Sequence, residues 1–400
     1  MDIGSSRAPL DLEYELASTF RVLGAKIHGD FDSVLEFQSL EVNDGNTFLQ
    51  IRPADVLIKV CFTDVNPVDL QKLRGRENDV GRSTANPPHV PGYGGSGVVV
   101  KVGSAVPNAD EWKGKSVCFL ADPARMGSYA TYIVVDANCV AKIPLNDVVI
   151  QSALTSNANH ESSSIMRSCA SIPIAGLTAF ESLGKCGLVN ILESNQNDRG
   201  ASGSLLIVGA AGGVGSWTIV LAKVLNPCLE IIATASTQAQ HDWCTALGAD
   251  IVIRHDEIGA RLEGGREGSV DTIVCLTEPT PDLFGTLSEV VKPYGSICLV
   301  SAGKSIGSLN LGFCFFKCVD VKTETVFSSI RTKYRNIVPA KELELIVDLI
   351  ARGKIKAPLS PELENGNVSE SIQNATSKNG VLEALSQPTG RCGNFVMKVD

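Results

Sequence analysis

The chain has 400 residues, of which 44% are hydrophobic and 20% are charged, and its formal net charge is −9. This length exceeds what one hydrophobic core usually organises, so we expect two domains. The composition is that of a globular protein, and the acidic balance argues against nucleic acid or an anionic membrane surface as the main partner.

The first residues, MDIGSSRAPLDLEYELASTF, lack the apolar core of a signal peptide and the arginine-rich character of a transit peptide. No apolar run approaches the length of a bilayer span. We therefore expect a cytoplasmic protein. The twelve cysteines are scattered and show no C-x-x-C spacing, which predicts reduced, mostly buried side chains rather than a zinc or disulfide framework.

The first third of the chain is rich in strand signals separated by Gly, Pro and Asn. Strands are predicted at 55–62, 96–103, 115–120 and 129–135. Short strands at such spacing, without long helical patterns, predict a barrel-like or sandwich-like unit.

From Ile172 onward, strand and helix patterns alternate, which predicts a doubly wound parallel sheet. The predicted strands are 203–210, 230–236, 250–254, 270–276 and 295–302, and the helices between the first three are 213–225 and 238–249. After about Leu311 the pattern is mixed, with a helix at 341–353 and a last strand at 393–399. Two Ser/Asn-rich stretches, 151–164 and 190–203, are predicted to be solvated loops.

A glycine series, GAAGGVG, joins the predicted strand 203–210 to the helix that follows it. Glycines at such a turn let the backbone approach a bound group, and the N-terminus of the helix favours an anion. The alternative is a glycine elbow that only packs the helix tightly on the sheet. Because strand, turn, helix and second strand are all present, we predict a site for a dinucleotide pyrophosphate. Its residues are Gly209, Gly212, Gly213, Val214 and Gly215.

The end of the second strand indicates which dinucleotide binds. Ser236 and Thr237 stand where an acidic residue would bind the ribose hydroxyls of NAD, and small hydroxyl side chains leave room for a 2′-phosphate. NADP(H) is therefore favoured, although the nearest following cation is only His241. Ligands bind at the carboxyl ends of parallel strands. This topology adds Thr277, Ser301 and Ala302 to the predicted cofactor site.

These features resemble the medium-chain dehydrogenase/reductase superfamily, and within it the zinc-free quinone oxidoreductase branch. The resemblance runs from about Val22 to the C-terminus. It rests on VNPVD (65–69), VPGYGGSGVVVKVGSAV (90–106), GSYATYIVV (127–135), AGLTAFESL (175–183), VGAAGGVG (208–215) and LGAD (247–250). It implies a GroES-like β-rich catalytic domain made of residues 1–171 and 325–400, a Rossmann domain made of residues 172–324, and a homodimer.

The resemblance also implies catalysis without a metal. Zinc-dependent members place a cysteine and a His-Glu pair around the metal, and the matching positions here are Asn66, Tyr93 and Gly94. None of these is a plausible zinc ligand. The four-cysteine lobe that binds a structural zinc ion in those members is absent as well.

Without zinc, delivery of hydride to a conjugated acceptor is easier than oxidation of an alcohol. The resemblance places Asn66 beside the nicotinamide and the substrate, where its amide could donate to the carbonyl oxygen. Tyr93 is either a proton source or a packing residue, and Thr178 matches a residue that contacts the cofactor. Some relatives carry Tyr at the position of Gln71, and relatives often carry Lys at the position of Asn394. This chain departs from them at both positions.

We therefore expect an enzyme, a metal-free NADPH-dependent reductase of a small-molecule quinone or α,β-unsaturated carbonyl. One alternative is an enoyl-thioester reductase; another, from a different class, is a nucleotide-binding sensor or structural protein with little turnover. A zinc alcohol dehydrogenase is a third. The aromatic stretch Phe313–Phe316 is predicted either to line the acceptor pocket or to form a core or dimer-interface cluster. His89 is predicted to be a surface or capping residue.

Overall fold

The computed structural model describes residues 18–41, 49–75, 89–145, 160–189, 203–262, 269–332, 338–360 and 392–399. Most of the two Ser/Asn-rich stretches lies outside these residues. Of the first stretch, His160–Ser164 belong to a helix, and Gly203 of the second begins a strand. No helix in the described parts of the chain is long and apolar enough to cross a membrane.

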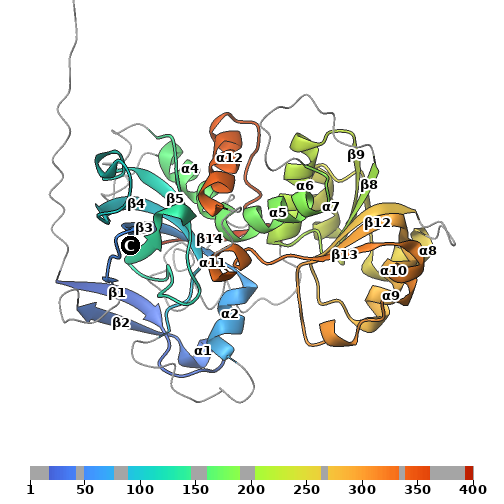
Figure 1. Cartoon of the computed structure of the whole chain (residues 1–400), viewed down its shortest axis with the longest axis horizontal. Coiled ribbons are helices and arrows are strands. Elements are labelled where there is room, and N and C mark those ends of the chain that lie inside the picture. The colour runs from blue at the N-terminus through green and yellow to red at the C-terminus, as the bar shows by residue number, and fades with distance from the viewer. Residues whose placement is uncertain are drawn as a thin grey trace, which may run out of the picture.

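An antiparallel sheet forms the left half of the molecule in Figure 1. Its strands follow the order β14-β3-β4-β5-β7, and β6 also pairs with β3. The strands are β3 (Asp55–Val65), β4 (Gly94–Val102), β5 (Ser116–Leu120), β6 (Tyr132–Asp136), β7 (Val140–Lys142) and β14 (Phe395–Lys398). Because β14 comes from the far end of the chain, this sheet joins both ends of the sequence.

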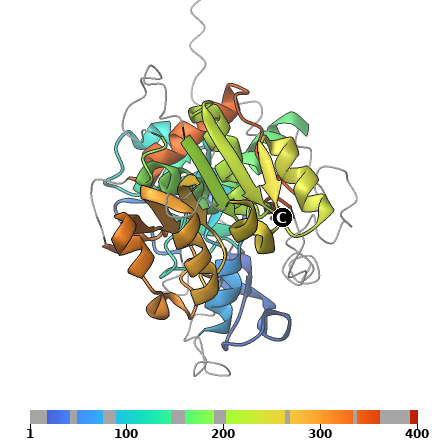
Figure 2. The ribbon, with the colours of Figure 1, turned by 90° about the vertical axis from the view of Figure 1, so that its right-hand side faces the viewer.

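A parallel sheet forms the other half, with strand order β10-β9-β8-β11-β12-β13. Figure 2 shows its strands side by side, with helices on both faces. The strands are β8 (Gly203–Val208), β9 (Leu229–Thr234), β10 (Ile251–Ile253), β11 (Val270–Cys275), β12 (Val291–Leu299) and β13 (Asp320–Thr323). The helices are α6 (Gly213–Leu225), α7 (Gln238–Leu247), α8 (Ile258–Arg261), α9 (Pro281–Val290) and α10 (Gly312–Lys317). Strand order reverses at β8, where ligands bind in doubly wound sheets.

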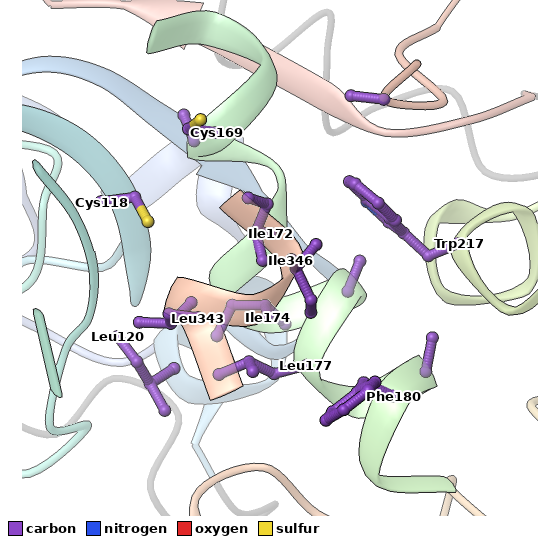
Figure 3. Close-up of a cluster of buried hydrophobic side chains, with 14 of the residues drawn as sticks. Cys118, Leu120, Cys169, Ile172, Ile174, Leu177, Phe180, Trp217, Leu343 and Ile346 are labelled. Atoms are coloured by element: carbon purple, nitrogen blue, oxygen red, sulfur yellow. The ribbon is translucent and has the colours of Figure 1, made fainter. Parts of the chain in front are cut away.

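One of the hydrophobic clusters contains residues of both sheets. Between them lie α4 (His160–Ala170), a π-helical turn η5 (Ile172–Gly176), α5 (Leu177–Lys185) and α12 (Pro339–Ala351). Figure 3 shows their buried side chains meeting those of β5 and α6. Nine of the twelve cysteines are buried, which confirms that most of them are buried as predicted.

A β-rich antiparallel unit beside a doubly wound parallel sheet confirms the predicted fold class. The domain boundary predicted at residue 171 falls between α4 and η5, and β13 ends at Thr323; the boundaries themselves stay a prediction. The sequence patterns missed several elements that are short or edge-exposed. Among these are the antiparallel pair β1 (Thr19–Gly24) and β2 (Glu36–Glu41), the short strands β7 and β13, and the short helices α8 and α10.

Candidate active site

The glycine series forms the turn between β8 and α6, and each glycine meets a different steric demand. Gly209 has a φ of +84°, which favours glycine, and its N–H donates to Thr234 Oγ1 at 2.9 Å. A Cβ on Gly215 would overlap the backbone of Ala210. Gly212 precedes the helix, is exposed, and has its nearest neighbour 3.7 Å from the position of a Cβ. The turn therefore leaves an open, side-chain-free surface at a helix N-terminus, which fits a pyrophosphate.

Predicted cofactor residues from the other strands lie at the same edge of the parallel sheet, the one formed by the carboxyl ends of the strands. Thr277 follows β11 and packs its methyl group 3.0 Å from the position of a Gly209 Cβ. Ser301 and Ala302 follow β12, the first half-buried and the second exposed. Thr178 is buried on α5, three residues after Ala175, whose Cβ lies 3.6 Å from the position of a Cβ on Gly213.

Ser236 and Thr237 are exposed beyond the end of β9. The Thr237 hydroxyl accepts the N–H of Gln240 at 3.3 Å and caps α7, so a helix already uses it. Ser236 carries no such role.

An arginine follows the neighbouring strand β10: it is Arg254, whose guanidinium is paired with Asp256 at 3.0 Å. The Ala235 N–H donates to the Ile253 carbonyl at 2.9 Å, which brings Arg254 and His255 beside Ser236. His255 Nδ1 lies 2.8 Å from Thr234 Oγ1, the same oxygen that accepts the Gly209 N–H. Arg254 is a candidate phosphate ligand that sequence reasoning missed, because it follows β10 rather than β9.

On the antiparallel sheet, Asn66 follows β3 and begins α2 (Pro67–Arg74). Asp69 holds this turn against the start of β4: one carboxylate oxygen accepts the Asn66 N–H at 2.8 Å and the other accepts the Gly92 N–H at 2.9 Å. The Tyr129 hydroxyl donates to the same carboxylate at 3.3 Å. Burial raises the pKa of Asp69 to about 7 despite these bonds. Asp69 therefore brings Asn66 and Tyr93 together.

Tyr93 is fully buried, and its ring packs edge-on against Phe327 at a centroid distance of 5.8 Å. Its hydroxyl lies 3.2 Å from His89 Nε2. Burial lowers the pKa of His89 to about 4, with a smaller contribution from the charges of His28 and Lys72. Burial also raises the pKa of Tyr93. A neutral phenol is thus paired with a neutral imidazole, and His89 has a partner that the sequence prediction for it did not include.

The C-terminal segment connects the two halves of the site. Phe395 pairs with Val65 in an antiparallel register, and continuing that register places Asn394 beside Asn66. The side-chain oxygen of Asn394 occupies the space that a Cβ on Gly213 would need, and the Gly393 N–H donates to the Ala211 carbonyl at 2.9 Å. The Asn66 turn therefore lies next to the N-terminus of α6, where the glycine turn ends.

A cavity of about 380 Å³ runs along α2 on the side of Gln71. Its lining residues are Gly29, Asp30, Pro67, Leu70, Gln71, Arg74 and Gly75. The aromatic stretch Phe313–Phe316 does not line it: this stretch lies on α10, beside the parallel sheet, whereas α2 lies near the middle of the molecule (Figure 1). Phe315 and Phe316 are 80% and 85% exposed, so the core interpretation of this stretch is wrong, and the acceptor-pocket interpretation stays a prediction.

Among the described residues, no group of three or more His, Cys, Asp or Glu side chains could hold a metal ion. Asp69 links the Asn66 turn to the segment that holds Tyr93 and Gly94, but an amide, a phenol bonded to an imidazole and a glycine are a poor ligand set for zinc.

Comparison with known proteins gives the same picture of the fold. Residues 52–145 match the alcohol dehydrogenase GroES-like domain. A zinc-type alcohol dehydrogenase-like protein of Staphylococcus aureus is 33% identical over 68% of this chain and 73% of its own length. The chloroplastic NADPH-dependent alkenal/one oxidoreductase of Arabidopsis thaliana is 33% identical over 59% of this chain and 53% of its own length.

The quinone oxidoreductase structure from Coxiella burnetii superimposes with a TM-score of 0.68, at 21% identity, over 96% of this chain and 100% of that one. Together with the matched GroES-like domain and the extent of identity to the S. aureus protein, this establishes that the chain belongs to the medium-chain dehydrogenase/reductase superfamily.

Proposed function

We propose that the protein is an NADPH-dependent reductase that transfers hydride to a quinone or an α,β-unsaturated carbonyl compound without a metal. The observation that carries this proposal is the placement of the Asn66 turn next to the N-terminus of α6, through Asn394 and the pairing of β14 with β3. The hydrogen-bond donor to the carbonyl oxygen of the substrate and the binding surface for the cofactor pyrophosphate then lie in the same site. The naming of an Arabidopsis relative as an NADPH-dependent alkenal/one oxidoreductase supports the same reaction class.

NADPH, when bound, supplies a hydride to an electron-poor carbon of the acceptor. The glycine turn and the N-terminus of α6 would hold its pyrophosphate, and Ser236 with Arg254 would hold the 2′-phosphate. As hydride reaches the β-carbon, negative charge develops on the carbonyl oxygen. The Asn66 amide would donate to that oxygen, in a site whose burial strengthens the interaction.

The reduced acceptor still needs a proton at its α-carbon. The Tyr93 hydroxyl is protonated at neutral pH and can give this proton. The phenolate would recover a proton from the Nε2–H of His89 as the other ring nitrogen takes one from water, because His89 is only partly buried. Tyr93 therefore acts as the proton source in this proposal, with His89 as its link to solvent.

The test is oxidation of NADPH by a panel of acceptors after treatment with a chelator. We expect turnover with an alkenal, an enone and an ortho-quinone, and none with a saturated ketone. Activity confined to alcohols and NADP⁺ and abolished by the chelator would instead identify a zinc alcohol dehydrogenase. Tight nucleotide binding with no turnover on any acceptor would favour a sensor or structural role.

We further propose a homodimer formed through the outer edge of the parallel sheet. β13 is one of the two edge strands, and α10, which precedes it in the chain, exposes Phe315 and Phe316. Exposed aromatic pairs beside an unpaired strand edge favour association. Sedimentation of the double variant Phe315→Ser/Phe316→Ser should show a monomer where the wild type shows a dimer, and a monomeric wild type would contradict this.

A further inference from the structure

Side chains connect the glycine turn to the two strands on one side of β8. The Gly209 N–H donates to Oγ1 of Thr234, the last residue of β9, at 2.9 Å. The same oxygen lies 2.8 Å from Nδ1 of His255, which comes two residues after β10 ends. Because the sheet order is β10-β9-β8, these three residues form one row of polar contacts across the carboxyl-end edge. The proposed reaction gives Thr234 and His255 no role.

The chemistry of a hydroxyl group assigns donor and acceptor in this row. A threonine hydroxyl has one hydrogen and two lone pairs, and the Gly209 N–H uses one lone pair. Among the described residues, the other hydrogen-bond partner of this hydroxyl is His255 Nδ1, so donation to Nδ1 leaves the hydroxyl hydrogen paired. The ring hydrogen of a neutral His255 then lies on Nε2. Burial lowers the pKa of His255, and the charge of Asp256 only partly opposes this, which agrees with a neutral ring.

Gly209 needs restraint from outside because glycine has little conformational preference of its own. Its φ is +84°, and a glycine populates positive and negative φ about equally. On the side of β11, the methyl group of Thr277 lies 3.0 Å from the position of a Cβ on Gly209. On the side of β9, the next N–H of the turn, that of Ala210, donates to the Thr234 carbonyl at 3.2 Å. The strands next to β8 therefore fix the conformation in which the chain enters the turn.

Thr234 acts from inside the protein. Its side chain is fully buried, whereas Ser236 and Thr237, which follow it, are exposed. A nucleotide lies outside the carboxyl ends of the strands, so Ser236 can touch it and Thr234 cannot. Any effect of Thr234 on the nucleotide must therefore pass through Gly209.

We propose that Thr234 and His255 are positioning residues of the nucleotide site: the Thr234 hydroxyl accepts the Gly209 N–H, donates to His255 Nδ1, and so holds the glycine turn in the orientation that binds a pyrophosphate. The inference rests on the proposed function, in which this turn binds the pyrophosphate of NADPH. The first N–H groups of α6 have no acceptor within the helix and are free for an anion. Their direction depends on how the chain enters the turn at Gly209.

The first arm of the test measures nucleotide affinity by fluorescence titration. Thr234→Val keeps the shape of the side chain but removes the acceptor, so the Kd values for NADPH and NADH should both rise roughly 10-fold. Thr234→Ser keeps the hydroxyl and should restore both Kd values to within about twofold of the wild type. An equal loss for the two nucleotides is expected because they share the pyrophosphate. A loss confined to NADPH would overturn the proposal.

A double variant tests whether His255 acts through Thr234. NADH lacks the 2′-phosphate, so titration with NADH excludes contacts to that group. His255→Phe removes the acceptor of the Thr234 hydroxyl and should raise the Kd for NADH by a smaller factor than Thr234→Val. Thr234→Val/His255→Phe should bind NADH no more weakly than Thr234→Val alone. Additive losses would overturn the assigned role of His255.

Thr272→Val is the matched control for the loss of a buried threonine hydroxyl. Thr272 is 5% exposed on β11 of the same sheet, three residues before the end of that strand. This variant should bind both nucleotides with the wild-type Kd. If it loses as much affinity as Thr234→Val, the effect is a general loss of stability, and the proposal is wrong.

The second arm uses the protein without nucleotide, so it separates this inference from the proposed function. Hydrogen–deuterium exchange of the peptide 205–212 should be roughly 10-fold faster in Thr234→Val than in the wild type, because the Gly209 N–H has lost its acceptor. Thr234→Ser and Thr272→Val should exchange at the wild-type rate. Unchanged exchange in Thr234→Val would overturn the proposal. A wild type that binds no nucleotide would contradict the proposed function, and the exchange rates would still decide whether Thr234 holds the turn.

Discussion

The carboxyl-end edge of the parallel sheet and the turn regions of the antiparallel sheet contribute to the site in opposite ways. At the edge, backbone and glycines make an open surface, with Gly212 and Ser236 exposed. At the turns, buried side chains make it: Asn66 is 8% exposed and Tyr93 is 0% exposed. An open backbone surface suits a ligand that must bind and leave, whereas buried side chains suit a charge that develops only during reaction.

Because of this contrast, substitutions in the two regions should impair different steps. Changes at the sheet edge should weaken nucleotide binding and leave the intrinsic rate of hydride transfer intact. Changes at the turns should slow hydride transfer in a protein that still binds the nucleotide. Single substitutions in each region test that separation.

Gly215→Ala should have the largest effect at the edge. Its Cβ would overlap the Ala210 backbone, so the turn must shift at a cost of about 1–3 kcal/mol, and NADPH binding should be lost. Gly285→Ala is the matched control, because this glycine lies on α9 outside the glycine turn, a Cβ there meets nothing within 4 Å, and the affinity should stay nearly unchanged. Fluorescence titration with NADPH measures both. Equal affinities for the two variants would show that backbone geometry at this turn does not control binding.

Tyr93→Phe tests the role of the turn regions of the antiparallel sheet in the reaction. Removing the hydroxyl removes the proposed proton source, and loss of a general acid costs roughly 10²-fold or more in kcat. The ring still packs against Phe327, so the melting temperature and the Kd for NADPH should change little. An unchanged kcat would make Tyr93 a packing residue, the alternative that its sequence context left open.

Arg254→Ala should have a smaller and more selective effect. Loss of a charge-assisted hydrogen bond to the 2′-phosphate, about 1.5–3 kcal/mol, raises the Kd for NADPH roughly tenfold or more. The Kd for NADH should not change. Arg261→Ala, at an exposed site on α8 nearby in sequence, is the control. If both nucleotides lose affinity equally, Arg254 does not bind the phosphate.

The same contrast explains what could be predicted from the sequence. The glycine turn lies in one contiguous stretch, and α6 begins and ends where its pattern predicted, at Gly213 and Leu225. Sterics and helix periodicity act locally, so a local pattern carries them.

The turn regions depend on residues that are distant in sequence. Asp69 bonds to Gly92 and Tyr129, 23 and 60 residues away, and Asn394 reaches Gly213 from the end of the chain. Only the folded sheet sets these distances, so the sequence pointed to Asn66 and Tyr93 by resemblance but not to His89 as their neighbour. Arg254 was missed for a similar reason, since its relation to Ser236 depends on the pairing of β9 with β10.

The most direct test of the account combines nucleotide binding and hydride transfer in one variant, Asn66→Ala. We predict that it binds NADPH with the wild-type Kd and transfers hydride to an enone roughly 10²- to 10³-fold more slowly in a single turnover. Hydride transfer at the wild-type rate would contradict the role of Asn66, and with it the claim that binding and chemistry are divided between the two regions.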